Sequence, residues 1–219
     1  MTPLDTRLSI IQFWDNDTPP YIQELLDSVR TLNPEFDYDC FNDESARSFI
    51  QQHYGSGVLD VYNDCTIPAM RADLFRYCYL HEIGGLYLDA DYRALTSLAP
   101  LTELAPRGYL YKHNKGICNG TLLFKQPRDS LVAAVLEMAL SNLSGLRESS
   151  NVWEITGPAI FHALHRDPER QYLFENFAII DDEQFFRYIK PVPHLPYKQT
   201  DAHWAVAWKK QLPIRTGGG

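Results

Sequence analysis

The sequence lacks the features that mark membrane, secreted or nucleic-acid-binding proteins. No run approaches the roughly 18 consecutive apolar residues of a transmembrane helix. Residues 1–7 show no basic segment followed by an apolar one, so we expect no signal peptide. Positive charge is in deficit, with 20 Lys+Arg against 28 Asp+Glu and a net charge of −8. This balance argues against a chain that wraps nucleic acid or lies on an anionic membrane.

Cysteine is also sparse. The four cysteines stand far apart in the 219 residues and form no CxxC pair, which argues against a zinc site and a disulfide framework. We interpret them as reduced thiols and predict a cytoplasmic location. No repeat, low-complexity segment or second composition regime divides the chain. We therefore predict one domain over residues 1–216, with residues 217–219 as a flexible glycine tail.

Apolar patterning indicates an α/β fold. We expect strands over residues 8–14 and 36–41, each followed by a helix, over residues 21–32 and 43–54. Gly55 to Gly57 should end the second of these helices. A further helix over residues 69–83, strands at 86–88, 109–111 and 120–124, and helices over 129–143 and 158–165 complete the pattern. Strands alternating with helices favour a layered α/β domain.

Two carboxylates stand directly after the strand at residues 86–88. Asp89 and Asp91 are two residues apart in an extended segment, so their side chains point to one side. Carboxylates held together repel unless a cation lies near them, and oxygen ligands suit Mg²⁺ or Mn²⁺. A strand's carboxyl end is also where open α/β sheets bind ligands. The competing interpretation is a solvated acidic turn, because DxD is common by chance.

The helix before this strand carries a second charged set. Asp73 and Arg76 are three residues apart and share one helix face. The helix is otherwise rich in leucine and aromatics, which favours a half-buried pair that serves a ligand or an internal network. Arg71 lies five residues before Arg76; it is either a second cation for phosphate groups or an exposed helix-start arginine.

Together these stretches resemble a known family. Residues 68–77, PAMRADLFRY, followed by residues 84–91, GGLYLDAD, resemble the DxD-containing family-32 glycosyltransferases, which include initiating mannosyltransferases and capsular polysaccharide enzymes. They are also similar to the glucosyltransferase domain of large clostridial toxins. The resemblance covers most of the chain and implies a GT-A fold: one Rossmann-like domain with a mixed central sheet flanked by helices, binding a nucleotide-sugar with Mn²⁺ or Mg²⁺.

The resemblance assigns roles around the DxD pair. Asp91 would bind the metal, and Asp89 would contact the ribose and reach the metal through water. Asp73 and Arg76 would hold hydroxyls of the donor sugar. Trp14, at the end of the first strand, would stack on the base; otherwise it is a core residue that closes the strand. Stacking of a base on an aromatic ring is worth roughly 1–3 kcal/mol.

Further residues follow by the same resemblance. Asn119 would be a catalytic residue near the donor sugar, together with Asp89 and Asp91. Gly120 would also lie near the sugar, and Tyr87 would be part of the donor site. Residues 201–208 resemble the family's closing H-W-x-x-S-W element, in which a serine and the last tryptophan approach the metal and the diphosphate. Ala207 replaces that serine, so His203 or a water would fill its place, and Trp208 would donate to a phosphate oxygen.

The implied activity is retaining transfer of a hexose from a nucleoside diphosphate sugar, which we expect to be UDP-linked, to a glycan, lipid-linked or protein acceptor. We expect no nucleic-acid partner and no integral membrane segment, and peripheral membrane association stays open. Two alternatives compete. A phosphohydrolase would need a nucleophilic Asp and ordered Lys and Asp partners, for which we find no matching set. A non-catalytic nucleotide-sugar-binding module is favoured only by Ala207.

Overall fold

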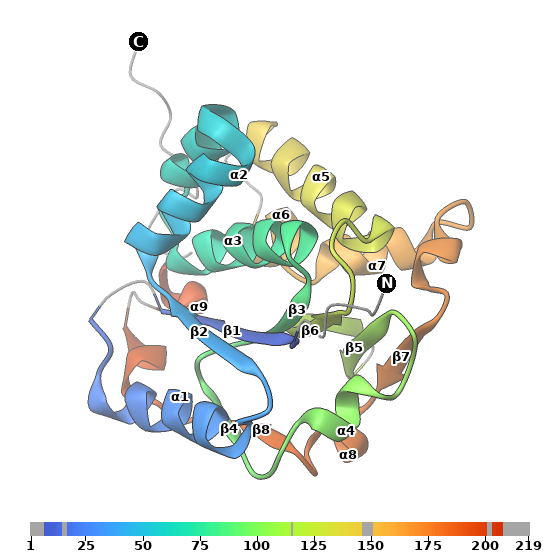
Figure 1. Cartoon of the computed structure of the whole chain (residues 1–219). Coiled ribbons are helices and arrows are strands. Elements are labelled where there is room, and N and C mark those ends of the chain that lie inside the picture. Colours follow the sequence, from blue (N-terminus) through green and yellow to red (C-terminus); the bar gives the residue numbers. More distant parts are fainter. Residues whose placement is uncertain (1–6, 15–16, 115, 146–150, 201–202, 208–219) are drawn as a thin grey trace.

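The computed structural model describes residues 7–14, 17–114, 116–145, 151–200 and 203–207. A sheet of six strands lies at the centre, in the order β2-β1-β3-β6-β5-β7, and a two-stranded sheet pairs β4 with β8 (Figure 1). The strands are β1 (Ser9–Phe13), β2 (Asp37–Phe41), β3 (Gly85–Leu88), β4 (Tyr92–Ala94), β5 (Gly108–His113), β6 (Gly116–Phe124), β7 (Phe177–Ile180) and β8 (Ile189–Pro191).

Strand directions bring several segments to one edge of the sheet. β1 is parallel to β2 and β3, whereas β6 is antiparallel to both β3 and β5. The carboxyl ends of β1, β3 and β5 and the amino end of β6 therefore meet at the same edge. Trp14, Asp89 and Asn119 are placed there by topology alone.

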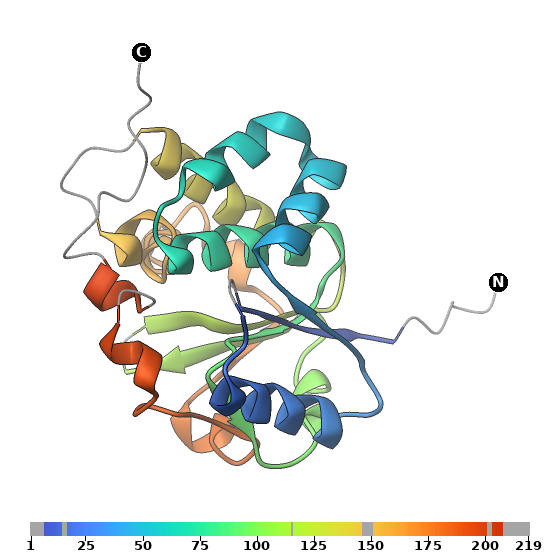
Figure 2. The same ribbon diagram turned by 90° about the vertical axis from the view of Figure 1, so that its left-hand side faces the viewer.

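Helices cover both faces of the sheet (Figures 1 and 2). Helices α2, α3 and α5 lie on one face, and α1, α4 and α8 lie on the other. The helices are α1 (Pro20–Leu32), α2 (Asp43–Asp64), α3 (Pro68–Glu82), α4 (Ala99–Thr102), α5 (Ser130–Ser144), α6 (Val152–Ile155), α7 (Ala159–Arg166), α8 (Asp182–Phe185) and α9 (Trp204–Ala207), with 3₁₀ turns η1 (Gln171–Phe174) and η2 (Pro196–Gln199).

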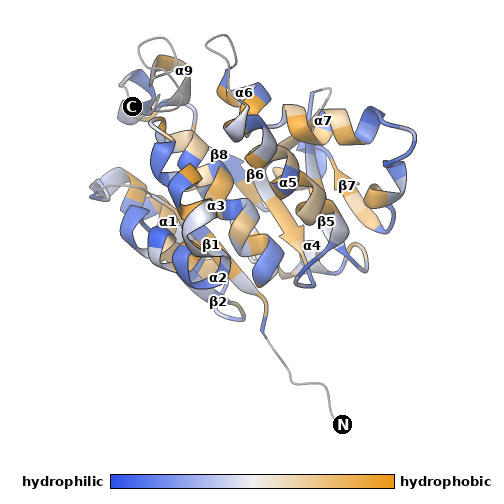
Figure 3. Ribbon diagram, turned by 90° about the horizontal axis from the view of Figure 1, so that it is seen from above, coloured by the Kyte–Doolittle hydropathy of each residue, from blue (hydrophilic) through white to orange (hydrophobic). Residues whose placement is uncertain are grey.

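The core forms on both faces because neighbouring strand residues point to opposite sides. Ile10 and Leu86 join the cluster on one face, and Ile11 and Tyr87 join the cluster on the other. Figure 3 colours β6 and β7 mostly hydrophobic and shows hydrophilic turns on the outer helices α1 and α2. Burial on both faces explains why β1 and β3 are near-continuous apolar runs.

The second helix differs from the sequence prediction. The helix predicted over residues 43–54 does break at Gly55, which adopts φ 74°, a conformation that glycine tolerates and other residues resist. However, helical structure resumes and continues to Asp64. Tyr62 anchors this second half, since its ring is buried and its hydroxyl donates to Asp43 Oδ1 at 2.9 Å.

The mixed sheet and flanking helices confirm the predicted fold class. Within the described ranges, no helix combines the length and the apolar character that crossing a bilayer demands. The predicted glycine tail at residues 217–219 lies outside the described residues.

Candidate active site

A pocket of about 270 Å³ opens at the edge where the strand ends meet. It gathers eight of the residues that the sequence analysis singled out, namely Trp14, Asp73, Arg76, Tyr87, Asp89, Asp91, Asn119 and His203. These side chains come from β1, α3, β3, β6 and the segment before α9. Trp153 and Tyr197 also line the pocket, and the sequence patterns did not single them out.

Arg76 is the central cation of the pocket floor. Its Nη2 lies 3.0 Å from Asp73 Oδ1 and 3.2 Å from Asp89 Oδ1, and Nη1 donates to the backbone carbonyl of Asn119. The guanidinium stands 4.2 Å above the ring of Tyr87, a cation–π contact that further stabilises the charge. Arg76 is 5% exposed, so α3 carries a buried charge that its partners neutralise.

Asp73 is held by three donors. Asn119 Nδ2 donates to Oδ1 at 2.8 Å and Thr156 Oγ1 donates to Oδ2 at 2.8 Å, in addition to Arg76. Asn119 Nδ2 also lies 2.9 Å from the hydroxyl of Tyr77, which donates to the Thr156 carbonyl at 2.7 Å. Burial raises the pKa of Asp73 to about 6, although Arg76, Thr156 and Asn119 oppose the rise.

Asp89 stands where β3 leaves the sheet. Its backbone N–H donates to the Gly120 carbonyl at 2.8 Å, and its own carbonyl accepts from Gln12 Nε2 at 3.2 Å. Burial raises the pKa of Asp89 to about 6; the guanidinium of Arg76 lowers it, and Asp91 raises it. The carboxylate is 36% exposed, so one side of it faces the pocket.

Gly120 makes room for this carboxylate. A Cβ at position 120 would lie 2.5 Å from Asp89 Oδ2 and 2.9 Å from the hydroxyl of Tyr92. Real Cβ atoms do not approach other heavy atoms so closely. The glycine in β6 is therefore required by the position of Asp89 on the neighbouring strand.

The side chain of Asp91 forms an ion pair and a hydrogen bond with residues of the C-terminal part of the chain. Lys198 Nζ lies 2.6 Å from Asp91 Oδ2, and the Tyr197 hydroxyl donates to the same oxygen at 3.0 Å. Both residues belong to η2, more than 100 positions later in the sequence. The backbone carbonyl of Asp91 also accepts from Val192 N–H at 2.9 Å.

Trp14 forms another wall of the pocket. Its backbone N–H donates to the Phe41 carbonyl at 2.9 Å, and its ring meets the ring of Tyr197 edge-on, with centroids 5.1 Å apart. The indole Nε1 is buried and finds no hydrogen-bond acceptor among the described residues. An unsatisfied buried donor is costly and calls for a partner, which a bound ligand or an ordered water would supply.

The comparison with protein families finds one matching family model. Residues 19–107, which include α3 and the DxD pair, match the family model described as "Glycosyltransferase sugar-binding region containing DXD motif". This part of the chain is therefore similar to the DXD glycosyltransferases.

Curated relatives are consistent with this assignment. The chain is 27% identical over 171 residues to mannosyl phosphorylinositol ceramide synthase SUR1 of Saccharomyces cerevisiae, covering 74% of this chain and 42% of the relative. It is 32% identical over 127 residues to inositol phosphoceramide mannosyltransferase 3 of Schizosaccharomyces pombe, covering 58% and 35%. The chain thus spans less than half the length of these relatives.

Solved structures confirm the predicted GT-A fold. The PaToxG glycosyltransferase superposes with a TM-score of 0.56 at 14% identity, over 93% of this chain and 87% of that one. The glycosyltransferase domain of the YGT toxin gives a TM-score of 0.58 at 9% identity, over 81% and 80%. At such identities the likeness establishes the fold alone.

The pair Asp89 and Asp91 fits a hard divalent cation by its chemistry. Both carboxylates line one pocket, and Mg²⁺ or Mn²⁺ is commonly bound by one or two carboxylates, waters and substrate phosphates. The described residues contain no cluster of three or more His, Cys, Asp or Glu that could hold a metal by themselves. The ammonium of Lys198 on Asp91 acts as a stand-in cation and shows that the position favours positive charge.

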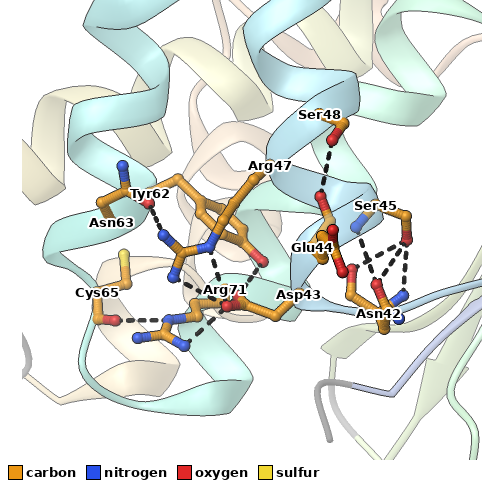
Figure 4. A network of polar contacts seen from close by, with 10 residues as sticks. All are labelled: Asn42, Asp43, Glu44, Ser45, Arg47, Ser48, Tyr62, Asn63, Cys65 and Arg71. Atoms are coloured by element: carbon orange, nitrogen blue, oxygen red, sulfur yellow. Dashed lines mark hydrogen bonds and ion pairs between the residues drawn. The ribbon is translucent and has the colours of Figure 1, made fainter.

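Two predicted site residues within the described ranges, Arg71 and Gly120, do not line the pocket. Figure 4 shows the contacts that Arg71 makes instead. Its Nε donates to the Cys65 carbonyl at 2.8 Å, and Nη1 lies 3.4 Å from Asp43 Oδ1. Tyr62 and Arg47 bind the same Asp43 carboxylate. Arg71 therefore joins the start of α3 to α2, which neither interpretation of it from sequence anticipated.

The C-terminal segment is described in part. His203 lines the pocket beside Tyr197, with ring centroids 6.0 Å apart, and burial lowers the pKa of His203, with Lys198 adding to the effect. Trp208, predicted to contact the diphosphate, lies outside the described residues. Helix α9 ends at Ala207, whose side chain offers no ligand atom in any conformation.

Proposed function

We propose that the chain is a divalent-metal-dependent, retaining glycosyltransferase that moves a hexose from a UDP-linked donor to a glycan, lipid-linked or protein acceptor. One observation carries the proposal: the Asp73–Arg76–Asp89 constellation and Asp91 share one pocket with Trp14. The family match of residues 19–107 supports a sugar donor, and the relatives' names state mannosyl transfer.

Two parts of the pocket would recognise the donor: Trp14 the base, and Asp73 the sugar. The ring of Trp14 offers a face for the base, since stacking tolerates any base. At the floor, Asp73 accepts hydrogen bonds from Asn119, Thr156 and Arg76, which leaves room for a fourth because an ionised carboxylate has about four acceptor positions. A hydroxyl of the donor sugar would take that position.

Asp89 and Asp91 would act on the leaving diphosphate by holding a divalent cation. Asp91, with Asp89 beside it, would hold Mn²⁺ or Mg²⁺, which neutralises charge on the departing diphosphate when it is bound. Arg76 fixes the position of Asp89 through the 3.2 Å ion pair. Preorganised charge of this kind costs no reorganisation at the moment of reaction.

Retention of configuration is part of the proposal, with front-face substitution assisted by the leaving phosphate. Asn119 was predicted as a catalytic residue beside the sugar, and it lines the pocket. Its Nδ2 is committed to Asp73 and Tyr77, and an amide is a poor nucleophile, so we assign it to positioning Asp73. The transition state would be oxocarbenium-like.

The test is donor hydrolysis in the presence of Mn²⁺. The protein is incubated with UDP-glucose, UDP-galactose, UDP-N-acetylglucosamine and GDP-mannose, and released nucleoside diphosphate is measured with and without EDTA. Slow metal-dependent hydrolysis of one donor supports the proposal and identifies the donor. NMR of the first sugar released tests retention, since an α-linked donor must give the α-anomer. Asp91→Asn should lower turnover by at least about 100-fold; full activity of this variant would remove Asp91 from the mechanism.

A non-catalytic nucleotide-sugar-binding module is the second candidate. Ala207 favours it, because alanine supplies no metal ligand where the resembled family has serine. Binding of a donor without turnover of any donor or acceptor would establish this second function and overturn the first.

A further inference from the structure

Each carboxylate of the DxD pair is neutralised by a cation from a different part of the chain. Arg76 of α3 pairs with Asp89, and Lys198 of η2 pairs with Asp91. The second pair is the more enclosed at its acidic end: the Asp91 side chain is 14% exposed and the Lys198 side chain is 19% exposed. The charges that should repel in the DxD pair are therefore already compensated.

Lys198 is fixed rather than loosely placed. Its Nζ donates to the Val192 carbonyl at 2.8 Å while it contacts Asp91 Oδ2 at 2.6 Å. Tyr197, the preceding residue, donates to the same Oδ2 at 3.0 Å and packs its ring against Trp14. The turn η2 thus contacts both Asp91 and Trp14, which line the same pocket.

An ammonium and a divalent cation cannot share that oxygen. Both would lie within about 4 Å of each other, where like charges in a partly buried site repel by several kcal/mol. We propose that Lys198 is an internal competitor of the divalent cation: it occupies Asp91 in the metal-free protein and must withdraw when the metal binds. This inference rests on the proposed metal dependence of the enzyme.

Competition between Lys198 and the metal would lower the affinity of the protein for the metal. A metal that binds wild-type protein must break an enclosed ion pair and leave the ammonium without its carboxylate, so part of its binding free energy is lost. Lys198 would therefore set the cation concentration that the enzyme needs. Because Tyr197 shares Asp91 Oδ2 with Lys198, withdrawal of the lysine would also alter the contact between η2 and Trp14.

The test measures Mn²⁺ binding to the whole chain without nucleotide, by the EPR signal of unbound Mn²⁺. Lys198→Met keeps an unbranched apolar stem of similar shape and removes the charge. We expect its Kd for Mn²⁺ to fall at least tenfold below the wild-type value. Lys198→Arg keeps a cation in place and should bind Mn²⁺ with nearly wild-type affinity.

Two controls locate the effect. Lys190→Met, at an exposed position of β8, makes the same change in net charge and should leave the Kd unchanged. Asp91→Asn combined with Lys198→Met should lose the gain, because the carboxylate that binds the metal is gone. A gain that persists in this double variant would overturn the proposal.

The outcomes separate this inference from the proposed function. If wild-type protein binds Mn²⁺ and Lys198→Met binds it equally or more weakly, competition is refuted while metal dependence stands. If no variant binds Mn²⁺ and EDTA leaves turnover unchanged, metal dependence and the competition both fail. Measurable binding by Lys198→Met alongside weak or undetectable binding by the wild type supports the inference.

Discussion

Arg76 and Asp89 are joined by a 3.2 Å ion pair that links α3 to the end of β3. The same guanidinium nitrogen reaches Asp73 at 3.0 Å, so one cation serves two carboxylates on the pocket floor. The second nitrogen, Nη1, donates to the Asn119 carbonyl, a contact that the planar guanidinium supplies in addition and the compact ammonium of lysine does not. The arrangement of the DxD motif is thereby tied to a helix that precedes it.

Loss of this cation should destabilise the fold as well as the site. Arg76→Ala would leave Asp73 buried without its ion-pair partner, and breaking a buried pair costs about 3–5 kcal/mol. Urea unfolding should show this loss. Arg76→Lys should retain part of the stability yet bind UDP more weakly than wild type, since a lysine has one nitrogen and cannot also replace the Nη1 hydrogen bond to the Asn119 carbonyl. Wild-type stability in Arg76→Ala would show that the pair contributes nothing.

Gly120 offers a test of close packing against Asp89. Gly120→Ala would place a Cβ 2.5 Å from Asp89 Oδ2, and the ion pair to Arg76 limits how far the carboxylate can move. We expect a loss of about 1–3 kcal/mol in the free energy of unfolding together with loss of donor turnover. Gly57→Ala is the matched control, because a Cβ at position 57 meets open space within α2, and it should stabilise the protein by up to about 1 kcal/mol.

Trp14 should determine affinity for the nucleotide. Trp14→Ala removes the proposed stacking face, so the Kd for UDP, measured by titration calorimetry, should rise by a factor of about 5–150, corresponding to about 1–3 kcal/mol. Trp14→Phe keeps an aromatic face and should lose less. Equal affinity in all three proteins would mean that Trp14 only closes the first strand.

Asp73 should oppose the usual effect of acid on stability. Its folded-state pKa is about 6, above the ordinary value of 3.8, so between these values the folded state binds more protons than the unfolded state. The free energy of unfolding should therefore fall as pH rises from about 4 to 6. The stability of wild type relative to Asp73→Asn should decrease over this range in urea titrations.

Asp182 provides the opposite sign for comparison. Hydrogen bonds from His113 and Tyr111 lower the pKa of Asp182, so its contribution is present above the unfolded-state pKa and is lost as pH falls. The stability of wild type relative to Asp182→Asn should decrease on acidification. Parallel pH slopes for the two variants would contradict the assignment for one of the two carboxyls, and the sign of the slope would say which.

The sequence predicted the parts of the site whose chemistry is local. Asp73 and Arg76 share a helix face because they are three residues apart, and Asp89 and Asp91 share a side because they are two apart in an extended segment. The structure brings all four to one pocket. Local spacing and a characteristic motif were sufficient there, since neighbours in sequence are neighbours in space.

Long-range partners could not be predicted in this way. Thr156 reaches Asp73, and Lys198 reaches Asp91, across more than 80 and more than 100 residues, and no local spacing pairs either residue with its partner. Arg71 shows the converse: its position on α3 suggested the site, but Asp43 of α2 holds its guanidinium. Which face of α3 meets α2 is a packing outcome that helical periodicity does not contain.

The amino-acid sequence by itself determined the α/β class, the order of the main elements and the position of the carboxylates at a strand end, because these follow from periodicity and short-range geometry. Tertiary structure alone decided which cation neutralises each carboxylate: Arg76 for Asp89, and Lys198 for Asp91. Electrostatic pairing depends on distance in space, and the folding of η2 against the sheet edge sets that distance.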